Sequence, residues 1–322
     1  MNIMRDFRSE VDLKLRIARK WREAEGVEAI ELEAPHGEDL PEWSPGAHID
    51  LFVQDGSARQ YSLCGDPANR KVWRIAILRE EDGRGGSRWL CDKVKEGDVL
   101  RTRGPRNHFP FDRASSYLFI AGGIGITPLL PMIAAAKAAG ADYRIAYGGR
   151  SRASMAFLDA IEAERERAAI CPLSTGQLDL DRLLADPGTD RLVYCCGPGG
   201  LLDALQEKSR HWPSGSVRIE RFSPKAQVDQ SPDRAFEVEL AKSGRVFAVP
   251  ASRSLLEVLE EAGADVVSSC GEGTCGSCLT PVLSGELEHR DSVLTEEERA
   301  RGDCLMVCVS RCRSSRLVLD IA

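Results

Sequence analysis

The sequence of 322 residues has no excess of basic residues and few histidines. Its 43 Lys and Arg are outnumbered by 50 Asp and Glu, which gives a formal net charge of -7. Because a general nucleic-acid binder needs a basic surface that displaces counterions from phosphates, we expect no nucleic-acid partner. The five histidines are scattered without metal or triad spacing, so surface or hydrogen-bonding roles are expected for them.

Uninterrupted hydrophobic runs are also lacking. The most hydrophobic stretch, residues 118–136, carries no charge but is broken by three glycines and two prolines. These residues fit a strand, a tight turn and a helix start better than one membrane-spanning helix. Residues 1–6 run straight into charges and contain no apolar core with a cleavage site. We therefore expect no signal peptide, no membrane partner and a cytoplasmic location.

The length and the hydrophobic content of 43% favour two or three domains with real cores, and we predict three. Residues 1–113 contain short alternating segments divided by Pro, Gly and Asp clusters, which predicts an antiparallel β-barrel. Residues 114–223 alternate apolar runs with helical stretches, which predicts an α/β domain with a parallel sheet. Residues 224–234 lack periodicity and predict a linker, and residues 235–322 predict a third, α+β domain.

Individual elements follow from the same patterns. Barrel strands are expected to include 11–17, 47–53 and 72–78. In the α/β domain we expect strands at 117–121, 143–147, 192–196 and 217–222, and helices at 127–139, 153–167 and 199–210. In the third domain we expect strands at 236–240, 246–249, 305–309 and 317–321. Ser254 and Thr295 each begin a capping box, so a helix should follow each of them.

Eleven cysteines would suggest disulfides in a small secreted domain, but in a chain of this size metal binding or burial is expected. Cys270, Cys275 and Cys278 have the spacing C-x4-C-x2-C, which is the pattern of a plant-type 2Fe-2S cluster. Glycines between them let the backbone wrap closely and direct amide N–H groups at the sulfurs. Structural zinc is the alternative, but zinc motifs usually bring a second, separated pair of ligands, and none is present.

The fourth ligand has three candidates, because Cys304 and Cys312 lie four residues on either side of Cys308. We prefer Cys308, which follows Cys278 after 29 intervening residues, because it lies inside the expected strand 305–309. Cys304 stands at the start of that strand and Cys312 in the polar turn after it. The predicted metal ligands are therefore Cys270, Cys275, Cys278 and Cys308.

Three further motifs can bind phosphates or a nucleotide. Residues 83–87, Gly-Arg-Gly-Gly-Ser, precede a helix-like segment and can present amide N–H groups to a phosphate. Residues 121–128 follow a strand and open a helix, with Thr127 placed as N-cap and Pro128 as the first helical residue, so the helix N-terminus favours a pyrophosphate. Residues 194–198 end another strand of the same sheet, where open parallel sheets bind ligands. Taken alone, each motif also fits an ordinary turn.

Arg59-Gln60-Tyr61-Ser62 resembles the Arg-x-Tyr-Ser motif of the ferredoxin reductase family of flavoproteins. Together with Gly-Gly-Ile-Gly-Ile-Thr-Pro, Tyr-Cys-Cys-Gly-Pro, His-Trp-Pro-Ser-Gly and Cys-Gly-Ser-Cys, the chain is similar over nearly its whole length to the phthalate dioxygenase reductase family. The resemblance implies FMN, NADH and a β-grasp ferredoxin domain with a 2Fe-2S cluster. FAD stays open because Leu78 stands where a basic residue is expected near the flavin phosphate. NADPH stays open because Arg150 and Arg152 follow a strand where the adenosine ribose should lie.

The resemblance also implies roles for single residues. Tyr61 would pack on the isoalloxazine, Ser62 would hydrogen-bond near flavin N5, and Arg59 would neutralise phosphate. Cys196 would lie beside the nicotinamide C4, and Phe222 would cover the flavin. Ser62 and Cys196 are therefore the catalytic candidates. The other cofactor-binding candidates are Gln60, Ala76, Arg79, Gly85, Gly86 and Ser87 for the flavin, and Gly123, Ile124, Gly125, Thr127, Pro128, Gly197 and Pro198 for the dinucleotide.

The function implied by the resemblance is that of an NADH-dependent reductase that feeds a Rieske-type oxygenase. Hydride arrives as an electron pair, and the flavin and the cluster together deliver single electrons, while the protein supplies orientation and electrostatics. A terminal oxygenase is therefore the expected protein partner. Two alternatives remain open: a reductase that serves another acceptor, such as a diiron hydroxylase or a quaternary-amine oxygenase, and a redox sensor.

Overall fold

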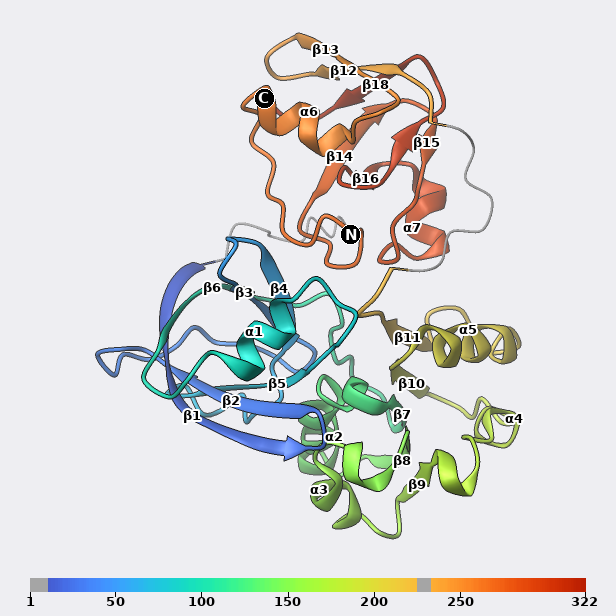
Figure 1. Cartoon of the computed structure of the whole chain (residues 1–322). Coiled ribbons are helices and arrows are strands. Elements are labelled where there is room, and N and C mark those ends of the chain that lie inside the picture. The colour runs from blue at the N-terminus through green and yellow to red at the C-terminus, as the bar shows by residue number, and fades with distance from the viewer. Residues whose placement is uncertain (1–10, 225–232) are drawn as a thin grey trace. The chain divides into compact units, whose positions relative to one another are not determined.

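The computed structural model describes residues 11–224 and 233–322. These residues form two compact units, Met1–Glu220 and Arg221–Ala322 (Figure 1). Most of the predicted linker, residues 225–232, lies outside the described residues. The boundaries of three domains stay a prediction. Across the described ranges, no helix combines the length and the apolar character needed to cross a membrane.

The first unit begins with a six-stranded antiparallel sheet in the order β4-β3-β6-β1-β2-β5. Its strands are β1 (Val11–Ala24), β2 (Val27–Glu33), β3 (His48–Phe52), β4 (Ala58–Ser62), β5 (Trp73–Leu78) and β6 (Val99–Arg106). Just after β4, Cys64 N donates a hydrogen bond of 2.9 Å to Arg74 O of β5, which brings the two edges of the sheet together. Inward-facing side chains such as Ile49, Leu51 and Trp73 are fully buried and form its core.

Helix α1 (Gly86–Asp92) packs its buried Leu90 into the barrel core. Lys20 of β1 binds the C-terminal end of this helix. Its Nζ donates to the carbonyl oxygens of Leu90, Cys91 and Val94 at 2.9, 2.6 and 2.8 Å. A cation at a helix C-terminus satisfies carbonyls that lack helical partners and complements the helix dipole. Lys20 therefore fixes the helix that begins at the predicted phosphate-binding turn.

Replacing Lys20 with methionine is expected to lower the free energy of unfolding by about 2 kcal/mol, because hydrogen bonds to a charged donor are lost. Urea denaturation followed by far-UV circular dichroism measures this change. The matched control is Lys14→Met, since Lys14 is exposed on the same strand, and its effect should stay within about 0.5 kcal/mol. Equal losses in the two variants would show that Lys20 does not anchor α1.

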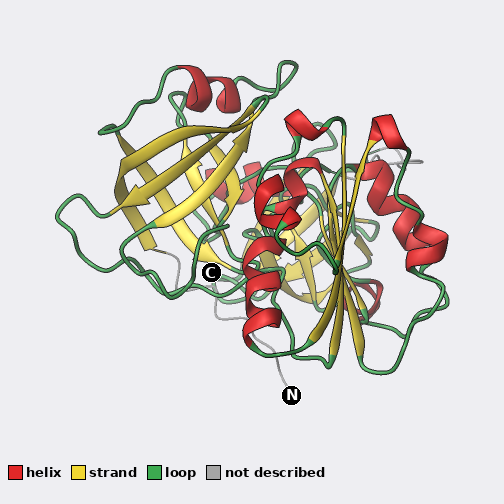
Figure 2. Cartoon of the chain, turned by 90° about the horizontal axis from the view of Figure 1, so that it is seen from below, coloured by secondary structure: helices red, strands yellow, loops and turns green. Residues whose placement is uncertain are grey.

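The rest of the first unit is a five-stranded parallel sheet in the order β11-β10-β7-β8-β9. Its strands are β7 (Ser116–Gly122), β8 (Asp142–Gly149), β9 (Ala168–Pro172), β10 (Arg191–Cys196) and β11 (Val217–Glu220). Its helices are α2 (Leu129–Ala138), α3 (Leu158–Glu162), α4 (Leu180–Leu183) and α5 (Gly199–Lys208). Separate hydrophobic cores cover the two faces of the sheet, and Figure 2 views the sheet nearly edge-on with helices on both sides.

Two helix predictions in this region were wrong. The expected helix 153–167 is a 3-10 turn (Arg152–Ser154) followed by the short α3, because Phe157 between them has a positive φ of 55°. Thr127 is not the N-cap of α2. A 3-10 turn (Gly123–Ile126) comes first, and the Thr127 hydroxyl donates to Ile124 O at 2.9 Å. Strand β9 and helix α4 were not among the expected elements, and the last strand ends at Glu220 instead of 222.

The second unit is built around a mixed sheet in the order β13-β12-β18-β14-β16. Its elements are β12 (Phe236–Leu240), β13 (Arg245–Val249), α6 (Leu255–Glu261), β14 (Leu279–Ser284), β15 (Leu287–Glu288), α7 (Glu296–Arg301), β16 (Cys304–Met306), β17 (Arg311–Cys312) and β18 (Arg316–Leu319). Helix α6 buries Leu255 and Leu259 in the core of this unit, as a β-grasp domain requires. Both predicted capping boxes are confirmed, at Ser254 and at Thr295.

Candidate redox centres

The four predicted cluster ligands lie together in the second unit. The thiol of Cys270 contacts those of Cys275 and Cys308, and the thiol of Cys278 also contacts that of Cys308. The side chains of Cys275 and Cys308 are both hydrogen-bonded to Cys270, so these thiols lie within contact distance of one another. The amide N–H of Glu272 points at Cys270 Sγ at 3.3 Å. Donor type, grouping and amide direction therefore fit an iron–sulfur cluster.

The two competing cysteines lie outside this group. Cys304 stands beside Asp303, and burial raises its pKa to about 11. Cys312 is buried with its Sγ 3.0 Å from Ser314 Oγ. Cys308 is therefore the fourth thiol of the group, but the reason given for choosing it was wrong. It lies in the turn after β16, while Cys312 belongs to β17.

The predicted flavin motif lies on β4. Ser62 is buried, and its Oγ has no hydrogen-bond partner among the described residues, so a polar atom of a ligand would satisfy it. Burial raises the pKa of Tyr61 above its usual range, which keeps the phenol neutral. Arg59 lies against the glycine turn before α1, because a Cβ on Gly86 would come within 2.7 Å of Arg59 Nε. Gly85 has φ of +89°, a value that favours glycine. The turn and the guanidinium together fit a phosphate.

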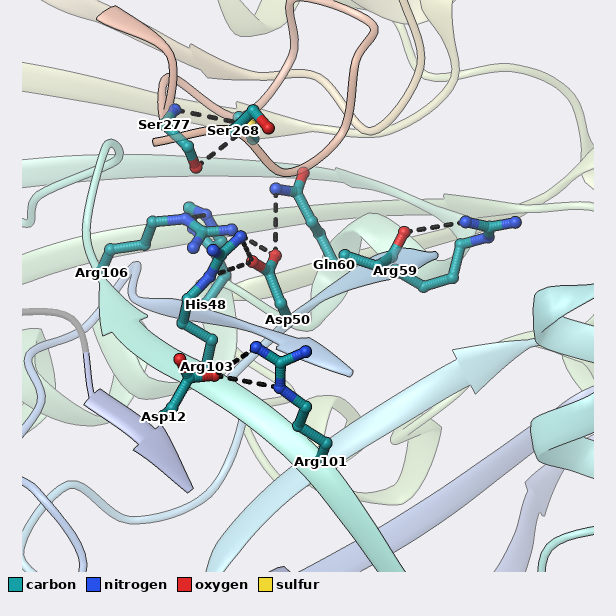
Figure 3. A network of polar contacts seen from close by, with 12 residues as sticks. Asp12, His48, Asp50, Arg59, Gln60, Arg101, Arg103, Arg106, Ser268 and Ser277 are labelled. Atoms are coloured by element: carbon teal, nitrogen blue, oxygen red, sulfur yellow. Dashed lines mark hydrogen bonds and ion pairs between the residues drawn. The ribbon is translucent and has the colours of Figure 1, made fainter. Parts of the chain in front are cut away.

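Gln60 takes part in a different network, which Figure 3 shows from close by. Its Nε2 donates to Asp50 Oδ1 at 3.3 Å. The fully buried Asp50 also pairs with Arg103 at 3.1 Å and with Arg106, whose Nε donates to His48 Nε2 at 3.0 Å. Because side chains alternate along a strand, Gln60 faces away from its two neighbours of the flavin motif. The network ties β3, β4 and β6 together.

Three other flavin candidates are engaged elsewhere in the structure. Arg79 donates to the two carboxylate oxygens of Asp92 at 2.9 and 2.8 Å and also pairs with Glu81. Ser87 Oγ accepts a hydrogen bond of 3.1 Å from Glu80 N. Ala76 is buried in the hydrophobic core under the parallel sheet. Arg59 also donates, from Nη1 to Ser57 Oγ and Ala58 O at 2.8 Å each, but it is the guanidinium that lies against the glycine turn.

The two dinucleotide motifs meet at the carboxyl ends of β7 and β10, which are paired in parallel. A Cβ on Gly122 would lie 2.6 Å from Pro198 Cδ, and one on Gly125 would lie 2.3 Å from Cys196 O. A Cβ on Gly197 would lie 2.9 Å from the Gly122 backbone. Glycine is required for this close approach, and the two turns meet at the position where parallel sheets bind nucleotides.

Comparison with known proteins agrees with this geometry. Residues 238–313 match the family model described as a 2Fe-2S iron-sulfur cluster binding domain. Phthalate dioxygenase reductase of Burkholderia cepacia is 41% identical over 96% of this chain and 97% of its own length. The chain belongs to the phthalate dioxygenase reductase family. The vanillate O-demethylase oxidoreductase of Pseudomonas putida is 40% identical over 93% of this chain and 96% of its own length.

Solved structures give the same result for the fold. A phthalate dioxygenase reductase structure matches with a TM-score of 0.71 and 41% identity, over 96% of this chain and 98% of that one. A full-length cytochrome P450 from Tepidiphilus thermophilus matches with a TM-score of 0.84 and 42% identity, but this chain spans only 42% of it. The predicted order of flavin barrel, nucleotide-binding sheet and β-grasp domain is confirmed, and this reductase is an electron-transfer oxidoreductase.

Glu220, at the end of β11 of this reductase, was not among the predicted site residues. Parallel pairing places Glu220 directly beside Cys196, and their side chains are hydrogen-bonded. Burial raises the pKa of Glu220 to about 8 and raises that of the Cys196 thiol well above its usual range. The second carboxyl oxygen of Glu220 is buried without a partner among the described residues. The sequence offered one sign of this site, namely a carboxylate at the end of the strand expected after the one that carries Cys196.

The remaining predicted residues are placed as follows. Thr127 is buried, and Pro128 forms the N-cap of α2. Ile124 and Gly123 belong to the 3-10 turn, where the Tyr147 hydroxyl lies 3.2 Å from Gly123 O. Phe222 follows β11, belongs to the second unit and is 43% exposed, so its contact with a flavin stays a prediction.

Replacing Gly125 with alanine is expected to separate the two dinucleotide-binding turns, because the new methyl group would overlap the Cys196 backbone. We expect the KM for NADH to rise about tenfold and the free energy of unfolding to fall by about 1–3 kcal/mol. Steady-state ferricyanide reduction and urea denaturation measure the two effects. Gly200→Ala is the control, since nothing lies within 4 Å of a Cβ on Gly200. An unchanged KM in Gly125→Ala would contradict the close approach.

Proposed function

We propose that this reductase takes a hydride from NADH onto FMN and passes electrons one at a time through a 2Fe-2S cluster to a terminal oxygenase. The observation that carries the proposal is the group of four thiols at Cys270, Cys275, Cys278 and Cys308. The same chain holds a barrel in which the buried Ser62 hydroxyl has no partner among the described residues, and two glycine turns that meet at paired strand ends. Relatives named as reductases of oxygenase systems support the acceptor.

The bound flavin supplies the conversion of an electron pair into single electrons. The protein's own residues bind and orient. Arg59 and the amides of Gly85 and Gly86 neutralise the flavin phosphate, while the buried Ser62 hydroxyl is available to hydrogen-bond the ring. At the strand ends the fully buried Cys196 thiol is hydrogen-bonded to the half-buried Glu220 carboxyl, which stays neutral and holds a proton.

FMN is proposed over FAD because the phosphate donors gather at one place, between Arg59 and the turn before α1. Arg79 and Leu78 add little to the binding of this phosphate, since Arg79 is paired with Asp92 and Leu78 is an exposed apolar side chain. NADH is proposed as the donor. A cytoplasmic location is proposed as well, because all eleven cysteines lie in the described residues and none forms a disulfide.

A second acceptor is favoured by one specific observation. The P450 from Tepidiphilus thermophilus matches this chain over 96% of its length at 42% identity. A haem monooxygenase is therefore the second candidate for the electron acceptor. Anaerobic mixing of the NADH-reduced protein with a Rieske oxygenase or with a ferric P450 distinguishes the two, because each acceptor has its own absorbance change on reduction.

The test of the function begins with anaerobic purification of the full chain, release of the flavin by heat, chromatography of the flavin, and assay of iron and sulfide. The expected result is FMN with about two irons and two sulfides per chain, together with rapid NADH-dependent reduction of cytochrome c. Release of FAD would correct the cofactor. Absence of labile sulfide from protein loaded with iron would refute the electron-transfer route, and slow cytochrome c reduction would favour a sensor.

A further inference from the structure

A turn formed by residues 291–294 packs against the middle of the loop that carries the first two predicted cluster ligands. Ser292 N donates a hydrogen bond of 2.8 Å to Gly273 O. Gly273 has φ of +69°, and a Cβ there would lie 2.6 Å from Val309 Cγ2 and 3.1 Å from Asp291 Cα. The turn therefore holds the loop backbone so closely that only glycine fits between them.

The side chain of Asp291 builds this turn. It is fully buried, and its Oδ1 accepts hydrogen bonds from Val293 N at 2.9 Å and from Leu294 N at 2.7 Å. An aspartate that accepts from amides two and three residues ahead fixes the backbone of a turn. Leu294 is buried in the core of the second unit, which anchors the far end of the turn.

The carboxylate of Asp291 is only partly satisfied by its neighbours. Its Oδ2 is buried and has no hydrogen-bond partner among the described residues. The nearest cationic group is Arg299 of α7, whose guanidinium lies 3.7 Å from Oδ1. The His289 imidazole, whose Nδ1 lies 3.8 Å from Oδ2, is kept neutral because burial lowers its pKa. Arg299 donates instead to the backbone oxygen of Asp291 at 2.5 Å. Buried polar atoms are almost always hydrogen-bonded, so an unsatisfied carboxyl oxygen beside the cluster loop suggests a functional role for Asp291.

We propose that Asp291 is a positioning residue for the 2Fe-2S cluster. Through its turn it fixes the loop between Cys270 and Cys275, and through its buried negative charge it lowers the reduction potential of the cluster. An added electron is less stable beside a negative charge in a medium of low dielectric constant, and net charge is one of the factors that set cluster potentials. This role rests on the proposed function, because it requires the cluster at the four cysteines.

The test uses the full chain with both cofactors and two substitutions that separate the two effects. Asp291→Asn keeps an oxygen that can accept from both amides but removes the charge. At a fixed potential, its ratio of reduced to oxidised cluster should rise about tenfold, which is 59 mV for one electron, with iron release to a chelator as slow as in wild type. Asp291→Ala removes the turn as well and should release iron about tenfold faster. Asp320→Ala is the control, since Asp320 of the same unit is partly exposed and pairs with Lys242 at 3.6 Å.

Wild-type potential in Asp291→Asn together with wild-type iron release in Asp291→Ala would overturn the proposal. If Asp291→Ala does not fold, Arg299→Met decides, because it removes the bond to the Asp291 backbone from a helix surface. It should release iron about threefold faster, and a wild-type rate would overturn the proposal. A wild-type chain without iron and sulfide would refute the proposed function itself, whereas a loaded wild type with unchanged variants refutes only the role of Asp291.

Discussion

Replacing Cys308 with serine is expected to lower NADH-dependent cytochrome c reduction at least about a hundredfold, while NADH-dependent ferricyanide reduction stays within about twofold of wild type. Cys308 contacts the thiols of both Cys270 and Cys278, so it joins the carboxy-terminal turn to the cysteine loop. Mutating a residue that only hydrogen-bonds to a metal ligand already lowers metal affinity by about 10–100-fold. Removing a ligand itself should therefore lower it further. Ferricyanide accepts electrons from the flavin directly, so its reduction does not depend on the cluster.

Iron and sulfide assays on the same samples connect the kinetics to the metal. Cys308→Ser should contain little labile sulfide, whereas Cys304→Ser and Cys312→Ser are matched controls that should keep a full cluster. Cys304 stands outside the thiol group, and Cys312 contacts Ser314 instead. A full cluster in Cys308→Ser with a lost cluster in either control would move the fourth ligand to that cysteine.

Local signals predicted a large part of the fold. The capping boxes at Ser254 and Thr295 involve residues three apart, so the sequence contains the whole interaction, and both helices start where expected. The broken helix around Phe157 could not be predicted in this way. Phe157, which has the positive φ, donates from its backbone N to Glu23 Oε1 at 3.0 Å, a partner 134 residues away on the barrel.

In the candidate site, too, the residues placed by local sequence could be predicted and those placed by distant contacts could not. The loop from Cys270 to Cys278 is local, and its spacing predicted three thiols that the structure brings together. Arg79 as a phosphate ligand stays a prediction, and its pairing with Asp92, 13 residues ahead, could not be read from the sequence. Gln60 as a flavin ligand stays a prediction, while the direction of its side chain, away from Arg59 and towards Asp50, follows from strand alternation alone.

Glu220 could not be found from local sequence, because only the register of β10 against β11 brings it beside Cys196. Burial raises the pKa of this carboxyl from 4.5 to about 8, so the folded protein holds a proton that the unfolded chain has released. The stability that this group contributes is fully present below about pH 4.5 and is lost as the pH rises to 8. Each pH unit in that window costs about 1.4 kcal/mol, so the total loss over the whole window is about 5 kcal/mol.

Glu220→Gln keeps a neutral, hydrogen-bonding side chain at every pH, so it should remove this dependence. We expect the wild-type protein to lose about 4 kcal/mol between pH 5 and pH 9 from this group and the variant to lose none of it. Urea denaturation at several pH values, followed by flavin fluorescence to report on the first unit, measures the difference. Glu207→Gln is the control, because Glu207 is an exposed residue paired with Arg210, and its pH slope should equal that of wild type. If the free energy of unfolding of Glu220→Gln changes with pH as steeply as that of the wild type, Glu220 ionises in the folded protein as it does in water. The neutral pair with Cys196 would then have to be abandoned.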